Sequence, residues 1–251
     1  MQRDWNEVAD SYDESVFDVL AHDRKGLIEA SLRKYGREAK TATDVGCGIG
    51  KCVALMAENF PRVEALDLSA KCLDRARKAH ARLDNVGFAV ADLADPGVKL
   101  PKSDLALCVN VLLTPSLTHR TRMLDALCGH LRRKGHLVLV VPSLESALLS
   151  NARLIEWNVR SGISPARADV AGFPTRNEPD YRKLHAGVLR LGGADTKHFL
   201  KEEVQLLLGE RGLQVLEMHK LEYPWATEFD EPPAWMQEPC PWDWLCVARM
   251  G

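Results

Sequence analysis

The segment Asp44–Gly50 combines a carboxylate with three glycines at alternate positions, Gly46, Gly48 and Gly50. Glycines let the backbone turn sharply and approach a ligand closely. A helical pattern follows this segment, so the loop would also offer unpaired N–H groups to a carboxylate or a phosphate. The spacing differs from the Gly-x-Gly-x-x-Gly of dinucleotide-binding folds, because Lys51 stands where the third glycine would be. This difference counts against a nicotinamide or flavin cofactor.

Two further acidic residues follow apolar runs downstream of this loop. Asp67 comes at the end of Val63–Leu68, and Asp92 comes directly after Gly87–Ala91. A carboxylate can accept both hydroxyls of a ribose, or the exocyclic amine of a purine. Asp67 alone fits a surface carboxylate or a helix cap almost as well. Because the carboxyl ends of parallel strands meet at one edge of a sheet, the glycine loop and both carboxylates together predict a nucleoside-containing cofactor.

The elements that would position these residues form repeated β-α units from Thr41 onward. We expect strands at Thr41–Val45, Val63–Leu68, Gly87–Ala91, Leu105–Leu112, His136–Val141, Val188–Leu191, Leu213–Tyr223 and Trp242–Met250. We expect helices near Lys51–Asn59, Ala70–Leu83, Arg120–Arg132, Ser143–Val159 and Lys201–Arg211. The pattern predicts a doubly wound, mostly parallel seven-stranded α/β sheet with helices on both faces and a helical and loop insertion after the fifth strand.

The chain is expected to form a single domain over residues 1–251. Residues 1–40 would form a helical cover packed over the sheet edge, and residues 41–143 the ligand-binding core. Residues 144–199, punctuated by glycines and prolines, predict an insertion or lid. Residues 200–251 would supply a closing helix and strands.

The composition of 46% hydrophobic and 27% charged residues is that of an ordinary globular protein. The formal net charge of -2 provides no basic field, so neither a nucleic acid nor a membrane is the expected partner. Basic residues such as Arg75 are expected on a solvated helix face. The polar N-terminus shows no signal peptide, and the seven cysteines contain no Cys-x-x-Cys pair. We therefore expect reduced thiols, no metal site and a cytoplasmic location.

The sequence resembles the class I, Rossmann-like S-adenosylmethionine-dependent methyltransferases. Asp44–Gly50 matches the first motif of that family. The further matches are Asp67, Asp92, the fourth-strand segment Asp104–Leu113, and the N-terminal run Trp5–Ala9 that leads to Tyr12. The resemblance covers residues 1–143 in detail and the closing strands in outline.

This resemblance implies S-adenosyl-L-methionine as the cofactor. The implied cofactor-binding residues are Asp44, Gly46, Cys47, Gly48, Gly50, Asp67, Leu68, Asp92, Leu93, Asn110 and Tyr12. In this family Asp44 would hold the amino group, Asp67 the ribose and Asp92 the adenine, while Cys47 would contribute its backbone. Asn110 would present its carbonyl to the cofactor and its side chain to the acceptor. An aromatic residue in the place of Tyr12 often closes over the cofactor.

The implied reaction is direct in-line transfer of a methyl group to an O, N or S atom of a small molecule. A base is optional in such a transfer, and His119 and Tyr12 are the candidate catalytic residues. His119, like His22 and His185, also fits an ordinary surface or packing histidine. Relatives that methylate nucleobase or glutamine amides carry Pro-Pro and an aromatic after the residue matched by Asn110. Val111–Leu113 follows here, so that subgroup is disfavoured.

Acceptor recognition is expected in the variable parts: residues 1–25, the insertion and the aromatic tail. The rings of Trp225, Trp235, Trp242, Trp244 and Tyr223 could cage a cationic amine, but packed strand residues explain them more simply. Two other function classes stay open. One is a catalytically decayed S-adenosylmethionine-binding regulatory or scaffold protein, and the other is a dinucleotide-dependent oxidoreductase. Either a monomer or a homodimer fits the sequence.

Overall fold

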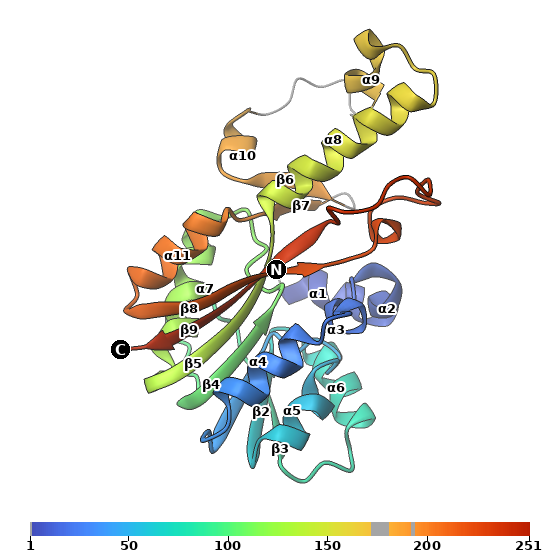
Figure 1. Cartoon of the computed structure of the whole chain (residues 1–251). Coiled ribbons are helices and arrows are strands. Elements are labelled where there is room, and N and C mark those ends of the chain that lie inside the picture. The colour runs from blue at the N-terminus through green and yellow to red at the C-terminus, as the bar shows by residue number, and fades with distance from the viewer. Residues whose placement is uncertain (1, 172–180, 192–193) are drawn as a thin grey trace.

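The computed structural model describes residues 2–171, 181–191 and 194–251. Its centre is a seven-stranded sheet in the order β3-β2-β1-β4-β5-β9-β8 (Figure 1). The strands are β1 (Thr41–Val45), β2 (Arg62–Asp67), β3 (Val86–Val90), β4 (Ser103–Val109), β5 (Leu131–Pro142), β8 (Leu213–Glu222) and β9 (Trp242–Met250). The first five strands pair in parallel, whereas β9 runs antiparallel to both β5 and β8. This order confirms the doubly wound, mostly parallel fold.

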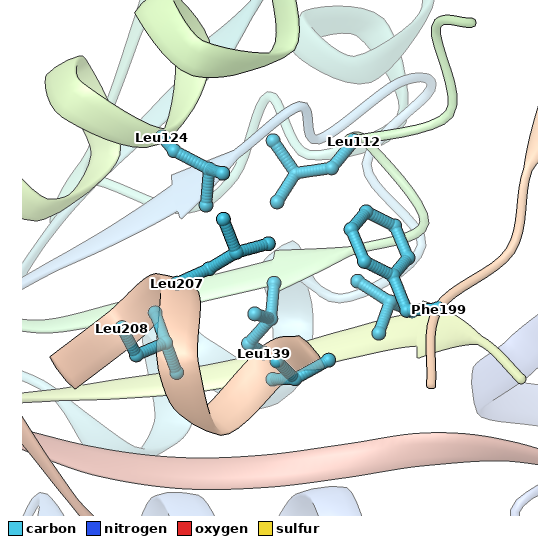
Figure 2. A pocket seen from close by; sticks show the side chains of 8 residues that line it. Leu112, Leu124, Leu139, Phe199, Leu207 and Leu208 are labelled. Atoms are coloured by element: carbon cyan, nitrogen blue, oxygen red, sulfur yellow. The ribbon is translucent and has the colours of Figure 1, made fainter. Parts of the chain in front are cut away.

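Helices cover both faces of this sheet. They are α1 (Gln2–Val8), α2 (Tyr12–Ser15), α3 (Val19–His22), α4 (Leu27–Tyr35), α5 (Val53–Asn59), α6 (Ala70–Ala79), α7 (Leu117–Gly129), α8 (Leu144–Arg160), α9 (Pro165–Ala171), α10 (Tyr181–His185) and α11 (Lys201–Gly209). Short 3-10 turns lie at Ala9–Ser11 and Trp225–Thr227. On one face α7 and α11 pack against β5 through Leu124, Leu207 and Leu139 (Figure 2). Every side chain lining that pocket is apolar, so it belongs to the core and offers no polar group to a ligand.

Serine caps fix where several helices begin. The side chain of Ser69 accepts a hydrogen bond from the Cys72 amide at the start of α6, and Ser116 caps α7 in the same way. The Ser116 cap explains why α7 begins at Leu117 rather than at the expected Arg120. The same helix ends at Gly129 because the next residues already belong to β5, which is longer than the expected His136–Val141.

The strand expected at Val188–Leu191 is present as β6, which pairs with β7 (Ala194–Lys197) in a two-stranded sheet separate from the main one. The N-terminal segment was expected to pack over the sheet edge, but its helix α4 packs over the middle of the sheet. Ile28 and Leu32 of α4 are fully buried against the central strands β4, β5 and β9, because these strands present an apolar face that needs a helix.

The insertion contains α8, which Figure 1 shows extending away from the sheet together with α9. Part of the expected irregular stretch, residues 172–180 and 192–193, lies outside the described residues. In the part of the chain that the structure describes, no helix combines the length and the apolar composition needed to cross a membrane.

Candidate functional site

The loop after β1 takes backbone conformations that suit glycine. Gly46, Gly48 and Gly50 have φ angles of 75°, 56° and 90°. The amide of Gly46 donates to the carbonyl of Leu66 at 2.7 Å, which ties the loop to the end of β2. A Cβ atom added at Gly48 would lie only 2.2 Å from the Tyr12 hydroxyl oxygen. Glycine is therefore required at this position both for the left-handed backbone and for the close approach.

Asp67 joins this loop to the start of α6. Its carboxylate accepts the Gly48 amide at 2.8 Å and the Ser69 amide at 2.7 Å. The Ser69 hydroxyl in turn donates to the side chain of Asn6 at 2.6 Å, so the N-terminal cover is attached at the same point. Burial raises the pKa of Asp67, while the backbone amides that donate to it oppose this rise.

Asp44 lies at the end of β1, just before the loop. The residue is 3% exposed, and its buried Oδ2 atom accepts no hydrogen bond within the described chain. Burial, and then the nearby charge of Asp67, raise the pKa of Asp44 to about 7. A buried carboxylate oxygen without a donor is costly, so a ligand that supplies a positively charged donor would be bound well here.

Asp92 lies at the next strand end along the same edge. Its carboxylate accepts the amide of Ala94 at 2.8 Å, and the neighbouring Ala91 amide donates to the Asp67 carbonyl at 2.9 Å. The adjoining Leu68 is half-buried and Leu93 is buried. The structure thus gathers the expected acidic residues and their apolar neighbours at the carboxyl ends of β1, β2 and β3.

Tyr12 reaches this group from the N-terminal cover. Its hydroxyl faces Gly48, and burial together with the charges of Asp67 and other nearby groups raises its pKa. Tyr12 therefore stays protonated at neutral pH.

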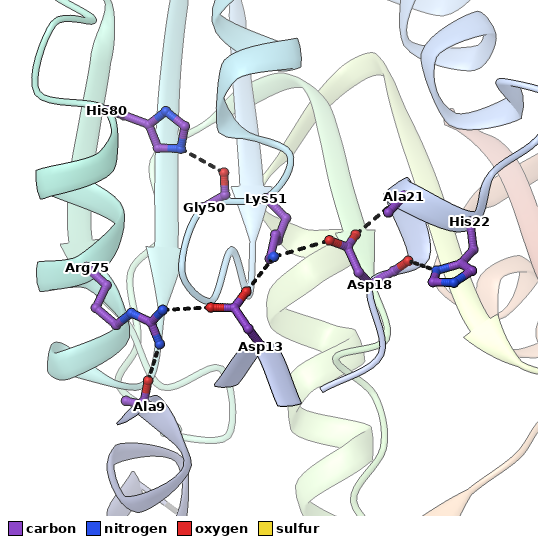
Figure 3. Close-up of polar contacts among 9 residues, drawn as sticks. All are labelled: Ala9, Asp13, Asp18, Ala21, His22, Gly50, Lys51, Arg75 and His80. Carbon is purple, nitrogen blue, oxygen red and sulfur yellow. Dashed lines mark hydrogen bonds and ion pairs between the residues drawn. The ribbon is translucent and has the colours of Figure 1, made fainter. Parts of the chain in front are cut away.

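Ion pairs fasten the cover to the loop and to α6, as Figure 3 shows. Asp13 pairs with Lys51 at 2.6 Å and with Arg75 at 2.8 Å, and Asp18 contacts the same lysine at 3.2 Å. Arg75 also donates to the carbonyl of Ala9. Sequence reasoning missed this set of contacts and placed Arg75 on a solvated face. The charges that pair lie tens of positions apart, and no local spacing signals such a pair.

Asn110 marks the other side of the site, directly after β4. It has a left-handed φ of 50° and donates through Nδ2 to Asp243 at 3.0 Å. The hydroxyl of Tyr223 donates to the same carboxylate oxygen at 2.9 Å. Sequence reasoning selected Asn110 and missed Asp243, because Asp243 stands between two tryptophans in a strand whose pattern indicates packing alone.

The three candidate histidines do not join the acidic cluster. His119 lies in the first turn of α7, where its amide is capped by Ser116 at 3.4 Å, and its half-buried ring takes no hydrogen bond from the described residues. The His22 ring contacts the Asp18 carbonyl at 2.8 Å and stacks on Phe17. His185 ends α10 and is exposed.

The aromatic tail is engaged by side chains of the protein itself. Arg153 lies over the rings of Trp225 and Trp235, and Arg160 lies 4.0 Å from the Trp235 ring centroid. Trp242 and Trp244 are buried in the core, in edge contact with each other. These contacts favour the packing interpretation of the tail over a cage for a cationic amine.

Comparison with known proteins agrees with this arrangement. Residues 42–135 match the family model of a methyltransferase domain. The chain is 33% identical over 95 residues to the biotin biosynthesis bifunctional protein BioHC of Teredinibacter turnerae, an alignment that covers 33% of this chain and 16% of that protein. It is 34% identical over 107 residues to the trans-aconitate 2-methyltransferase of an Azoarcus species, covering 42% of this chain and 40% of that protein. The chain thus spans less than half the length of either of these relatives.

Among solved structures, the magnesium protoporphyrin IX methyltransferase of Synechocystis superposes with a TM-score of 0.64 at 16% identity. That superposition covers 100% of this chain and 98% of the other, so the whole fold is shared. The segment that matches the methyltransferase domain model contains the glycine loop, Asp67, Asp92 and Asn110, and the chain as a whole has the Rossmann-like α/β fold of this methyltransferase structure.

Proposed function

We propose that this protein binds S-adenosyl-L-methionine and transfers its methyl group directly to an O, N or S atom of a small-molecule acceptor. The observation that carries the proposal is the buried Oδ2 atom of Asp44 beside the glycine loop, which accepts no hydrogen bond from the residues that the structure describes. The amino group of the cofactor would supply the charged donor that this oxygen lacks.

The other residues at the rim fit the remaining parts of the cofactor. Asp67 has lone pairs left for ribose hydroxyls after accepting two amides, and Leu68 would pack beside them. Asp92 would accept the adenine amine next to the apolar Leu93. The backbone of the segment Gly46–Gly50, with Cys47, would enclose the methionyl part.

The bound cofactor would supply an electrophilic methyl group on a positively charged sulfur. The protein would then have to orient the acceptor and exclude water. Tyr12, held in its protonated form over Gly48, would close the site and donate a hydrogen bond. We assign to His119 the role of receiving a proton from the acceptor, because its ring takes no hydrogen bond from the described residues and so has free acceptor capacity.

We assign a separate role to each part of the chain. Residues 1–40 would cover the cofactor held by the core at 41–143, residues 144–199 would face the acceptor, and residues 200–251 would close the sheet of a single domain. The names of the two methyltransferases described above denote small-molecule acceptors, which supports the same class here. We further propose a monomeric or homodimeric cytoplasmic protein without a nucleic-acid or membrane partner, in line with the net charge of -2 and the free cysteines.

Isothermal titration calorimetry tests the proposal with three ligands: S-adenosylmethionine, S-adenosylhomocysteine and NAD. We expect heat with the first two and none with NAD. Binding of NAD alone would instead indicate an oxidoreductase. Methyl transfer is then tested by measuring S-adenosylhomocysteine formation with a panel of small acceptors. A catalytically decayed regulatory protein would bind S-adenosylmethionine but form no S-adenosylhomocysteine.

A further inference from the structure

A second polar group lies at the same end of the sheet, away from Asp67 and Asp92. Asn110 follows β4, Tyr223 follows β8, and Asp243 faces Pro142 of β5 in the antiparallel register of β9. Asn110 Nδ2 and the Tyr223 hydroxyl both donate to Asp243 Oδ2, at 3.0 and 2.9 Å, and Nδ2 keeps a second N–H. We call these three residues the rim triad.

The rim triad has more free acceptor atoms than free donor hydrogens. The Oδ1 atom of Asn110 is buried and has no partner in the described chain. Within the same residues Asp243 Oδ1 receives no hydrogen bond either, since both donors use Oδ2. Burial raises the pKa of Tyr223, and the Asp243 charge adds to that rise, so the tyrosine remains a donor. Asn110 Oδ1 therefore lacks the donor that a buried oxygen normally finds, and Asp243 Oδ1 keeps the capacity to accept a further hydrogen bond.

Two aromatic rings pack next to Tyr223. Phe17 of the N-terminal cover meets the Tyr223 ring edge-on at 4.9 Å between centroids, and the His22 ring stacks on Phe17 at 4.7 Å. Phe17 is 41% exposed, so part of its ring remains open to a molecule at the rim. A small molecule with an apolar body and a donor group would match both features.

Resting on the proposed function, we propose that the rim triad binds the methyl acceptor and selects one whose reacting atom carries a hydrogen-bond donor, an amine or a hydroxyl. The amine or hydroxyl hydrogens would be held by Asn110 Oδ1 and Asp243 Oδ1, with Tyr223 fixing the orientation of the Asp243 carboxylate. The same geometry disfavours a carboxylate as the reacting group, because it would place an anion against the two oxygen atoms that can accept hydrogen bonds.

The test uses sinefungin, a cofactor analogue in which a carbon bearing an ammonium group replaces the methylated sulfonium. Its ammonium would point toward the rim triad, whereas S-adenosylhomocysteine has no group there. Calorimetry on the wild-type chain should show sinefungin binding about tenfold or more tightly than S-adenosylhomocysteine, the effect of one charge-assisted hydrogen bond. Asp243→Asn should abolish this preference and leave S-adenosylhomocysteine affinity within about twofold.

Asp125→Asn is the matched control, since Asp125 lies in α7, pairs with Arg211 and has a side chain that is 60% exposed. This variant should keep the full preference for sinefungin. The proposal is overturned if the wild-type chain binds sinefungin and S-adenosylhomocysteine with equal affinity. It is also overturned if Asp243→Asn keeps the wild-type preference for sinefungin. Formation of methyl esters from carboxylic acids, rather than methylated amines or alcohols, also overturns it. Absence of S-adenosylhomocysteine binding to the wild-type chain would instead refute the proposed function itself.

Discussion

The side chain of Asp67 accepts the backbone amide of Gly48 at 2.8 Å, so this carboxylate helps to fix the shape of the glycine loop. The two residues are 19 positions apart: Asp67 ends β2, and Gly48 lies in the loop that follows the neighbouring parallel strand β1. The residue expected to hold the ribose therefore also shapes the loop that is expected to enclose the methionyl group. Disturbance of either residue should affect both parts of the site.

Replacement of Asp67 by alanine should weaken S-adenosylhomocysteine binding by roughly 100-fold. Hydrogen bonds to a charged group contribute about 1.5–3 kcal/mol each, and the variant would lose those to the ribose. Titration calorimetry measures the change. Asp74→Ala provides the control, because Asp74 is an exposed residue of the neighbouring α6 that pairs with Arg77. Full affinity in the Asp67→Ala variant would contradict the assignment of the ribose site.

Replacement of Gly48 by alanine should destabilise the chain and weaken ligand binding, since the new Cβ would meet the Tyr12 hydroxyl. The left-handed φ of 56° adds strain that costs an L-residue about 1–2 kcal/mol. Tyr12→Ala should relieve the clash but not the backbone strain. In a double-mutant cycle followed by thermal unfolding, the double variant should therefore be more stable than the sum of the two single effects predicts. Strict additivity would show that Tyr12 does not lie on the loop.

Much of the fold could be predicted because its signals are local. The bounds of β1 and β9 agree with those expected from apolar runs, and Ser69 caps α6 as its position before an amphipathic stretch indicates. The glycine loop and the acidic strand ends were predicted for the same reason. The backbone conformation of the glycine loop and the position of each acidic residue at a strand end depend on only a few consecutive residues.

The missed features depend on residues distant in sequence. Asn110 and Asp243 are 133 positions apart, and the Arg75–Asp13 contact joins residues 62 positions apart. Val188–Leu191 has strand propensity, yet only its pairing partner decides which sheet it joins. Tertiary pairing of this kind leaves no periodic trace in a single sequence.

Loss of the Asp13 carboxylate should loosen the N-terminal cover and speed ligand release. Asp13→Asn removes the charge that Lys51 and Arg75 share, so we expect S-adenosylhomocysteine to dissociate several-fold faster in stopped-flow displacement. Wild-type release should accelerate between about 0.02 and 0.5 M salt because exposed ion pairs are screened, whereas release from the variant should change little. Glu29→Gln, which breaks an exposed pair with Arg33 on α4, serves as the control. If the release rate depends on salt equally in Asp13→Asn and in the wild type, these ion pairs do not hold the N-terminal cover over the site.

Protonation of Asp44 should stabilise the ligand-free protein but weaken ligand binding. Folding stability and ligand affinity should therefore change with pH in opposite directions. In the free protein the pKa of Asp44 is raised from 3.8 to about 7, so the folded state holds a proton that the unfolded chain releases. The stability that comes from this proton is fully present below about pH 3.8 and is lost as the pH rises through 7.

Binding reverses this preference, because the cofactor ammonium favours the charged carboxylate. We expect S-adenosylhomocysteine affinity to rise by up to about tenfold per pH unit below pH 7 and to level off above it. Calorimetry at pH 6 in two buffers of different ionisation enthalpy should detect proton release on binding, and little release at pH 8. Asp44→Asn, which imitates the protonated side chain, should bind weakly at every pH and remove most of this dependence. An affinity that stays constant from pH 5.5 to 8 in the wild type would mean that Asp44 does not meet the ammonium group of the ligand.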